Sequence, residues 1–162
     1  MKYRYLGKSG LLLSRITLGT MTFGAADWGC DEKESQAIIM KYIDGGGNSI
    51  DCADIYAGGR SEEIIGNLMF ALKRDDIAIS SKCFFPAGSA ATSFGLSRKH
   101  VIASCEASLR RMKTDYIDIY YVHAYDPMTR PEETLRALDD LVRQGKIRYI
   151  GCSNLFGWQM VK

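Results

Sequence analysis

Five short apolar runs alternate along the chain with longer segments of helical period, and this alternation limits the fold more than any other feature. Successive runs begin roughly 30 to 40 residues apart, the length of a strand, a helix and a return. This pattern predicts an α/β fold with a mostly parallel sheet and right-handed crossovers. A small hairpin is predicted before them at Tyr3–Leu13, because glycines supply a turn between two apolar runs. The predicted strands are Ile16–Thr20, Asn48–Ala53, Ile77–Lys82, Ile117–His123 and Arg148–Asn154.

Four segments between these strands carry the start signals of helices. Short polar side chains that can cap a first turn precede each apolar stripe. The predicted caps are Asp31, Ser61, Ser97 and Thr129, the last in a capping box with Glu132. The predicted buried stripe of the fourth helix is Leu135, Leu138 and Val142. The basic residues of the third helix, Arg111 among them, predict a solvated face.

Charge and composition exclude several classes of partner. Lys and Arg total 21 and Asp and Glu total 19, so a net charge of +2 predicts neither nucleic acid nor a membrane as a partner. No run approaches the roughly 18 apolar residues of a membrane helix, and the polar start MKYRYLGKSG lacks the apolar region of a signal peptide. We therefore expect a cytoplasmic protein with a small-molecule partner.

The cysteines and histidines give no metal or disulfide pattern. The 5 cysteines are spread over the chain without a C-x-x-C pair, and the chain has 2 histidines. We expect neither a disulfide framework nor a metal site. Free cysteines of this kind usually act as small buried apolar residues in a reducing compartment.

Polar side chains gather where the predicted strands end. The carboxyl ends of parallel strands meet at one edge of a sheet, and neighbouring strands lie about 4.8 Å apart. Each residue alone has an ordinary explanation, such as a turn cap, packing or solvent exposure. Their joint position at strand ends indicates a site. The candidates are Asp51, Tyr56, Lys82, His123, Ser153 and Asn154.

The first four of these residues suit proton transfer to a carbonyl oxygen. A neighbouring ammonium favours the phenolate of a tyrosine, so Tyr56 can act as a general acid beside Lys82. Asp51 would hold that lysine charged and oriented, and His123 would hydrogen-bond a polarised oxygen. Because alternate strand residues face opposite sides, Cys52 should face the helices, away from this site. The chain has no G-x-G-x-x-G, Walker A, G-x-S-x-G or H-E-x-x-H motif.

Several blocks of the sequence resemble the aldo-keto reductase family. The strongest are the D-x-A-D-x-Y stretch, the lysine that ends a strand, the TDYIDxYxxH block and the G-x-SN strand end, in this order and spacing. The blocks that carry the resemblance are Leu18–Gly24, Gly46–Gly66, Ser80–Pro86, Ser97–Pro127 and Gly145–Asn154.

The resemblance implies a (β/α)₈ barrel of the TIM-barrel type that reduces aldehydes and ketones with NADPH, without a Rossmann glycine motif. Such barrels typically have about 250 residues, whereas this chain has 162. We therefore expect one partial domain over residues 1–162, truncated after about five parallel strands. The open edges of its first and last strands are expected to favour self-association.

The resemblance also assigns roles to individual residues. It implies that Tyr56 donates the proton, that Lys82 and Asp51 tune it, and that His123 orients the substrate carbonyl. For the carbonyl pocket, Trp28 and Phe84 are candidates that could equally be packing residues. The implied nicotinamide-binding residues are Ser153 and Asn154 at the carboxamide, with Thr20, Met21 and Asp51 lining the same pocket.

Two other interpretations stay open at this point. The chain could be a non-catalytic nucleotide-binding or regulatory member, as the potassium-channel β subunits of this family illustrate, or an inactive truncated remnant. The intact Asp51, Tyr56, Lys82 and His123 argue against a designed loss of catalysis. A complete flavodoxin-type binding domain is the other interpretation, and its phosphate loop would have to be Thr20–Gly29.

Overall fold

A five-stranded parallel sheet forms the centre of the protein in the computed structural model, which describes residues 1–86 and 88–161. The strands lie in chain order, and each pairs in parallel with the next. Both ends of every strand lie within two residues of the sequence prediction. The strands are β3 (Leu18–Gly19), β4 (Ser49–Asp51), β5 (Ala78–Cys83), β6 (Ile117–Val122) and β7 (Ile147–Cys152).

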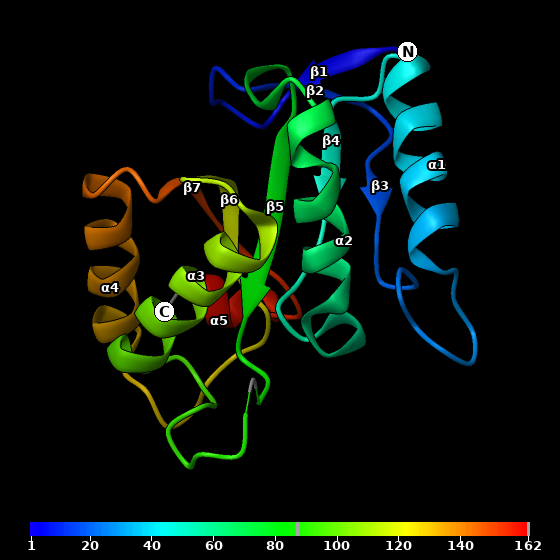
Figure 1. The fold of residues 1–162 in the computed structure, drawn as a ribbon. Coiled ribbons are helices and arrows are strands. Elements are labelled where there is room, and N and C mark those ends of the chain that lie inside the picture. Colours follow the sequence, from blue (N-terminus) through cyan, green and yellow to red (C-terminus); the bar gives the residue numbers. More distant parts are fainter. Residues whose placement is uncertain (87, 162) are drawn as a thin grey trace.

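Helices follow the strands as the alternating pattern predicts. Figure 1 shows the four longer helices succeeding one another across the sheet in chain order, from α1 on the right to α4 on the left. The helices are α1 (Glu32–Asp44), α2 (Arg60–Leu68), α3 (Arg98–Met112), α4 (Pro131–Arg143) and α5 (Gly157–Val161). Three short 3₁₀ turns are η1 (Tyr56–Gly59), η2 (Met69–Ala71) and η3 (Arg74–Asp76).

The two faces of the sheet bury different side chains. Between sheet and helices lies the main core, in which Ile50, Ile79 and Tyr120 are at most 1% exposed. On the opposite face, which we call the inner face, Ala78 and Ile119 form a smaller cluster. The main core therefore joins the helices to the sheet and leaves the inner face for other contacts.

An antiparallel hairpin precedes the sheet, as predicted. Its strands are β1 (Tyr3–Tyr5) and β2 (Leu12–Ser14). Leu13 of β2 packs in the inner-face cluster against Ala78, the first residue of β5. The hairpin therefore covers the amino end of the inner face and leaves the carboxyl end open for polar residues.

Two of the predicted helix caps are confirmed and two are wrong. The side chains of Asp31 and Ser97 accept hydrogen bonds from the first turns of α1 and α3. α2 instead begins at Arg60, after a left-handed glycine, and the Ser61 hydroxyl donates to Thr20. α4 begins at a proline, whose fixed φ suits the first helical position. Thr129 lies outside this helix, and its hydroxyl donates to Asp126 (2.8 Å).

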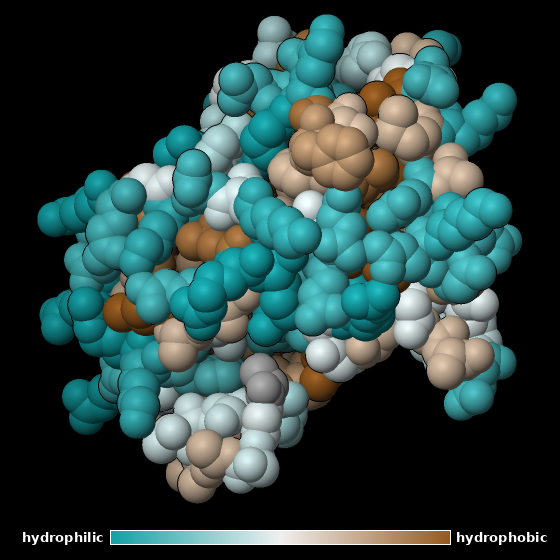
Figure 2. Space-filling view, viewed as in Figure 1, coloured by the Kyte–Doolittle hydropathy of each residue, from teal (hydrophilic) through white to brown (hydrophobic). Residues whose placement is uncertain are grey.

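Two predictions about helix faces also need correction. Leu135 is 55% exposed, because the buried face of α4 runs through Ala137, Leu138 and Leu141. Arg111 does not simply face solvent, since it pairs with the fully buried Glu62 of α2 at 2.6 Å. Hydrophilic residues nevertheless cover much of this side of the molecule (Figure 2).

Candidate active site

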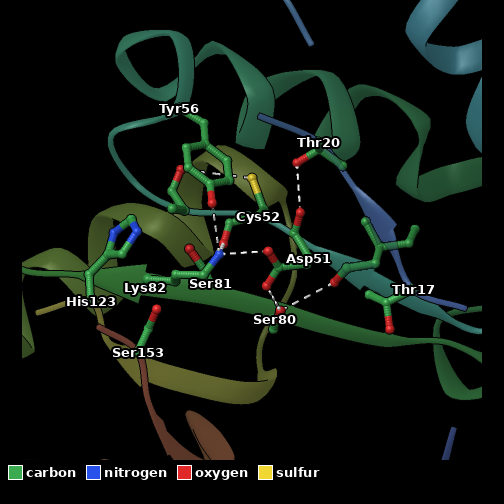
Figure 3. A network of polar contacts seen from close by, with 12 residues as sticks. Thr17, Thr20, Asp51, Cys52, Tyr56, Ser80, Ser81, Lys82, His123 and Ser153 are labelled. Atoms are coloured by element: carbon green, nitrogen blue, oxygen red, sulfur yellow. Dashed lines mark hydrogen bonds and ion pairs between the residues drawn. The ribbon is translucent and has the colours of Figure 1, made fainter. Parts of the chain in front are cut away.

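Lys82 lies at the centre of a polar network on the inner face, near the carboxyl end of β5 (Figure 3). Its side chain is 8% exposed. The ammonium donates to Asp51 Oδ2 at 2.7 Å, to the Cys52 carbonyl at 2.8 Å and to Tyr56 Oη at 3.1 Å. Three acceptors from one neighbouring segment thus fix this buried cation.

Asp51 is held by hydrogen bonds at both of its carboxylate oxygens. It ends β4 and is paired in register with Ser80 of β5. The Ser80 hydroxyl donates to Asp51 Oδ1 at 2.6 Å, while Lys82 binds the other oxygen. Ser80 was not predicted as a site residue, although a strand period of two places it on the same face as Lys82.

Tyr56 reaches this network because the chain after β4 stays bound to β5. The Cys52 amide donates to the Ser80 carbonyl, and the Asp54 amide donates to the Lys82 carbonyl. The chain then turns tightly through η1, where the next residue, Ala57, has a positive φ of 48°. This path places the phenol oxygen against the lysine ammonium.

The charge of Lys82 is stabilised despite its burial. Burial opposes the ammonium, but the hydrogen bond and negative charge of Asp51 outweigh it, and Tyr56 adds to this effect. The pKa of Lys82 therefore lies above its usual value. A permanent positive charge next to the phenol oxygen is the electrostatic feature that general acid chemistry at Tyr56 requires.

His123 follows β6 and completes the cluster. Its ring meets that of Tyr56 edge to face at 6.0 Å and that of Phe85 at 5.1 Å. Burial, and then the positive charge of Lys82, lowers the pKa of His123. The imidazole is therefore neutral at neutral pH and keeps one N–H to donate.

The aromatic residue beside this histidine is one that was not predicted from the sequence. Phe85 packs on His123. Phe84 is 8% exposed and packs against Phe94 at 4.8 Å, so it belongs to the core. Trp28, the other predicted pocket residue, is 63% exposed.

The predicted nicotinamide-binding residues other than Asp51 lie after two different strands, Ser153 and Asn154 after β7 and Thr20 and Met21 after β3. Ser153 and Asn154 follow β7 at the same sheet edge, and Asn154 Nδ2 donates to the His123 carbonyl at 2.9 Å. Met21 is 51% exposed beyond β3. Thr20 is fully buried, and its hydroxyl donates to the Asp51 carbonyl, so it supports the site from behind.

The cysteines next to the site face away from it, as strand alternation predicts. The Cys52 sulfur lies 3.2 Å from the Ser61 hydroxyl of α2. Burial raises the pKa of Cys52 and of Cys83 to about 12. Neither thiol is therefore a nucleophile at neutral pH.

A family model gives an independent comparison for this arrangement. The model of the aldo/keto reductase family matches residues 15–162. The chain belongs to the aldo/keto reductase family. The resemblance seen in the sequence blocks is thereby confirmed.

Two curated relatives show how far the similarity extends. Aldo-keto reductase AMT2 of Alternaria alternata is 40% identical over an alignment of 182 residues, which covers 95% of this chain and 50% of AMT2. A probable voltage-gated potassium channel subunit beta of Arabidopsis thaliana is 40% identical over 165 residues, covering 100% of this chain and 49% of the subunit. The chain thus spans about half the length of these relatives.

A solved aldo-keto reductase shares the fold. The thermostable enzyme Tm1743, crystallised with the inhibitor epalrestat, is 35% identical to this chain. The two superpose with a TM-score of 0.87 over 99% of this chain and 57% of that chain. This likeness confirms the prediction of a (β/α)₈ barrel-type fold with an N-terminal hairpin.

The described part of this aldo/keto reductase chain has neither a cluster of metal ligands nor a membrane-spanning helix. Over residues 1–86 and 88–161, no three His, Cys, Asp or Glu side chains are grouped so as to hold a metal ion. Among those same residues, no helix is both long and apolar enough to span a bilayer.

Proposed function

We propose that this protein is an oxidoreductase that reduces an aldehyde or ketone to an alcohol with NADPH, with Tyr56 as the proton donor. The contact that carries the proposal is the 3.1 Å hydrogen bond from the buried Lys82 ammonium to Tyr56 Oη. Membership of the aldo/keto reductase family supports the same reaction class. The part of the chain described here contributes the proton-transfer residues of that reaction.

Tyr56 gives its hydroxyl proton to the carbonyl oxygen of the substrate, which leaves a phenolate. The Lys82 ammonium stabilises this phenolate at hydrogen-bond distance. Asp51 keeps the ammonium charged and aimed, and its second oxygen is held by Ser80 so that the pair cannot rotate freely. When bound, the nicotinamide supplies the hydride that reduces the carbonyl carbon.

His123 orients the carbonyl oxygen in this proposal. The imidazole is neutral and stands edge-on to the Tyr56 ring. Its Nδ1 atom is buried and has no hydrogen-bond partner among the described residues. The proton of the neutral ring therefore sits most usefully on Nε2, where it can be donated to the same oxygen that receives the proton of Tyr56.

Ser153 and Asn154 fit the carboxamide of a nicotinamide. A carboxamide offers donors and an acceptor, and this pair offers a hydroxyl and an amide oxygen at the sheet edge that holds Lys82. Asn154 Nδ2 is already bound to the His123 carbonyl and to Ser153 Oγ, which fixes the amide. We assign the binding of the nicotinamide carboxamide to these two residues, with the exposed Met21 at the entrance to the site.

Replacement of Tyr56 by phenylalanine tests the proposal. The variant keeps the ring contacts and loses the proton, so carbonyl reduction should fall on the order of 10²- to 10⁴-fold while NADPH binding is kept. Turnover is followed by NADPH absorbance and binding by fluorescence titration. Unchanged turnover in this variant would refute the role of Tyr56 as proton donor. Failure of the wild-type chain to bind NADPH would refute the assignment of NADPH as its cofactor.

A non-catalytic nucleotide-binding member is the second candidate. Relatives named probable voltage-gated potassium channel subunit beta match the whole chain at 38% and 40% identity. Tight NADPH binding with no turnover of any aldehyde or ketone, in the wild type and in Tyr56→Phe alike, would favour this candidate.

We assign the protein to the cytoplasm. All 5 cysteines are free. Three of them are buried, as expected of small apolar residues in a reducing compartment.

A further inference from the structure

Asp54 is a buried carboxyl that the proposed reaction does not use. It lies between β4 and η1, two residues before Tyr56, and is 4% exposed. Its Oδ2 accepts a hydrogen bond from the Ser104 hydroxyl of α3 at 3.3 Å, and its amide donates to the Lys82 carbonyl at 3.2 Å. Its Oδ1 is buried without a hydrogen-bond partner among the described residues. The segment that carries Tyr56 is thus attached to β5 through its backbone and to α3 through this side chain.

The charged groups that act on Asp54 are one acid, Glu62, and one base, Arg111. Glu62 of α2 is fully buried, and its two oxygens are taken by the Ser81 hydroxyl and by Arg111 of α3. The positive charge of Arg111 is therefore already bound to another carboxylate. An ionised Asp54 would be a second buried negative charge without a cationic partner of its own.

The other titratable groups around Asp54 supply no compensating charge at neutral pH. Burial lowers the pKa of His100 on α3, which contacts Ser104 at 3.4 Å. Burial also raises the pKa of Cys83 on β5 to about 12 and that of Tyr120 on β6 well above its usual value. All three groups are therefore uncharged near neutral pH.

These surroundings control the protonation of Asp54. Burial, and then the negative charge of Glu62, raises the pKa of Asp54 to about 7, against the weaker opposing effects of Arg111 and the Ser104 hydrogen bond. The carboxyl is therefore neutral in mildly acidic solution and ionises as the pH passes through neutrality.

We propose that Asp54 is a positioning residue, which holds Tyr56 against the Lys82 ammonium while its carboxyl carries a proton and loosens that hold when the proton leaves. A neutral carboxyl can stay buried against α3, whereas an ionised one is stabilised by reaching water. Because Tyr56 is two residues away, we expect a backbone movement that carries Asp54 toward water to displace the phenol as well. The consequence for turnover rests on the proposed function, but the movement itself does not.

The pH dependence of stability follows from the direction of the shift. The folded protein keeps a proton on Asp54 that the unfolded chain releases, because the unfolded carboxyl has a pKa of about 4. Between about pH 4 and pH 7 the folded state binds more protons, so this contribution to stability is full below pH 4 and is lost as the pH rises to 7. Asp54→Asn, which cannot ionise, should lack this loss.

The direct test is a carbon-13 NMR titration of the aspartate carboxyls in the full chain, with Asp54 assigned by its absence in Asp54→Asn. We expect its midpoint near pH 7 and expect the Tyr56 ring carbons to shift with the same midpoint. In Asp54→Asn the Tyr56 shift at that pH should vanish. In the control variant Asp115→Asn, which removes an exposed aspartate before β6, the pH-dependent shift of the Tyr56 ring carbons should remain. A midpoint near pH 4, or a Tyr56 ring that ignores the titration, would overturn the proposal.

Turnover supplies a second readout. If only the protonated form holds Tyr56, kcat should fall about tenfold per pH unit well above pH 7 in the wild type and should lose this limb in Asp54→Asn, with KM little changed. The same alkaline limb in both proteins would overturn the positioning role. If the chain reduces no carbonyl, the proposed function fails, while the NMR titration still decides the role of Asp54.

Discussion

Replacement of Arg111 by methionine should destabilise the protein more than the loss of any exposed ion pair. Glu62 is 0% exposed, and Arg111 Nε lies 2.6 Å from its Oε2. The methionine keeps the apolar stem of the arginine but removes its charge. Among residues 1–86 and 88–161, Glu62 would then retain only the Ser81 hydroxyl as a hydrogen-bond partner.

The size of the effect follows from the burial of the two partners. Removing one partner of a buried pair costs about 3–5 kcal/mol, because the other charge stays buried without compensation. The Arg111 side chain is 25% exposed, so water partly screens the pair. We therefore expect the lower end, about 3 kcal/mol of unfolding free energy. For a chain of this size that corresponds to a drop in Tm of about 6–12 °C.

Urea unfolding followed by circular dichroism measures this cost at a pH below 6, where Asp54 stays neutral. The double variant Arg111→Met with Glu62→Met should recover most of the loss, since an apolar pair can replace a buried ion pair. Arg143→Met is the control, because its pair with Asp139 is exposed and should contribute less than about 0.5 kcal/mol. A loss below about 1 kcal/mol in Arg111→Met, or no recovery in the double variant, would refute the reasoning.

Three further predictions concern packing, thiols and strand edges. Gly66→Ala should lower the free energy of unfolding in urea by about 2 kcal/mol or more, although alanine favours helices. The added Cβ would lie too close to the Arg111 carbonyl oxygen. The control Gly157→Ala, which has open space around the added Cβ, should not destabilise the protein. Cys152 is exposed and should react fastest with a thiol reagent, and Cys152→Ser should remove this fastest phase. Burial raises the thiol pKa to about 12 at Cys52, Cys83 and Cys105, so these thiols should react more slowly. Within the described residues, β3 and β7 each pair with another strand on one side only. We therefore propose that the 1–162 polypeptide self-associates through these open edges. A single monomeric species throughout a concentration series in sedimentation velocity would exclude this.

The strands and the candidate site were predictable for the same reason. Strands of a parallel sheet are buried on both faces and read as short apolar runs, so a charged or polar residue at the end of such a run stands out. Lys82 and His123 were found in this way, and the structure brings both of them to Tyr56. The local sequence was therefore enough to predict most of the site residues on the inner face.

Contacts between helices were harder to predict from the sequence. The pair of Glu62 with Arg111 joins α2 to α3 across 49 positions of the chain, and helical periodicity alone indicates only which face a residue occupies. Phe85 was missed for a related reason. β5 ends at Cys83, so the alternation of strand faces no longer applies to the residues that follow, and only the turn decides which phenylalanine meets His123.

The alternation within β5 joins the candidate site to the ionic cluster behind it. Ser80 and Lys82 face inward and together hold both oxygens of Asp51, whereas Ser81, between them, faces the helices and donates to Glu62. A shift of β5 by one residue would exchange these roles and would leave an ammonium in the core. The site and the cluster around Asp54 therefore share one strand register, and a change that strains one is expected to reach the other through β5 rather than through solvent.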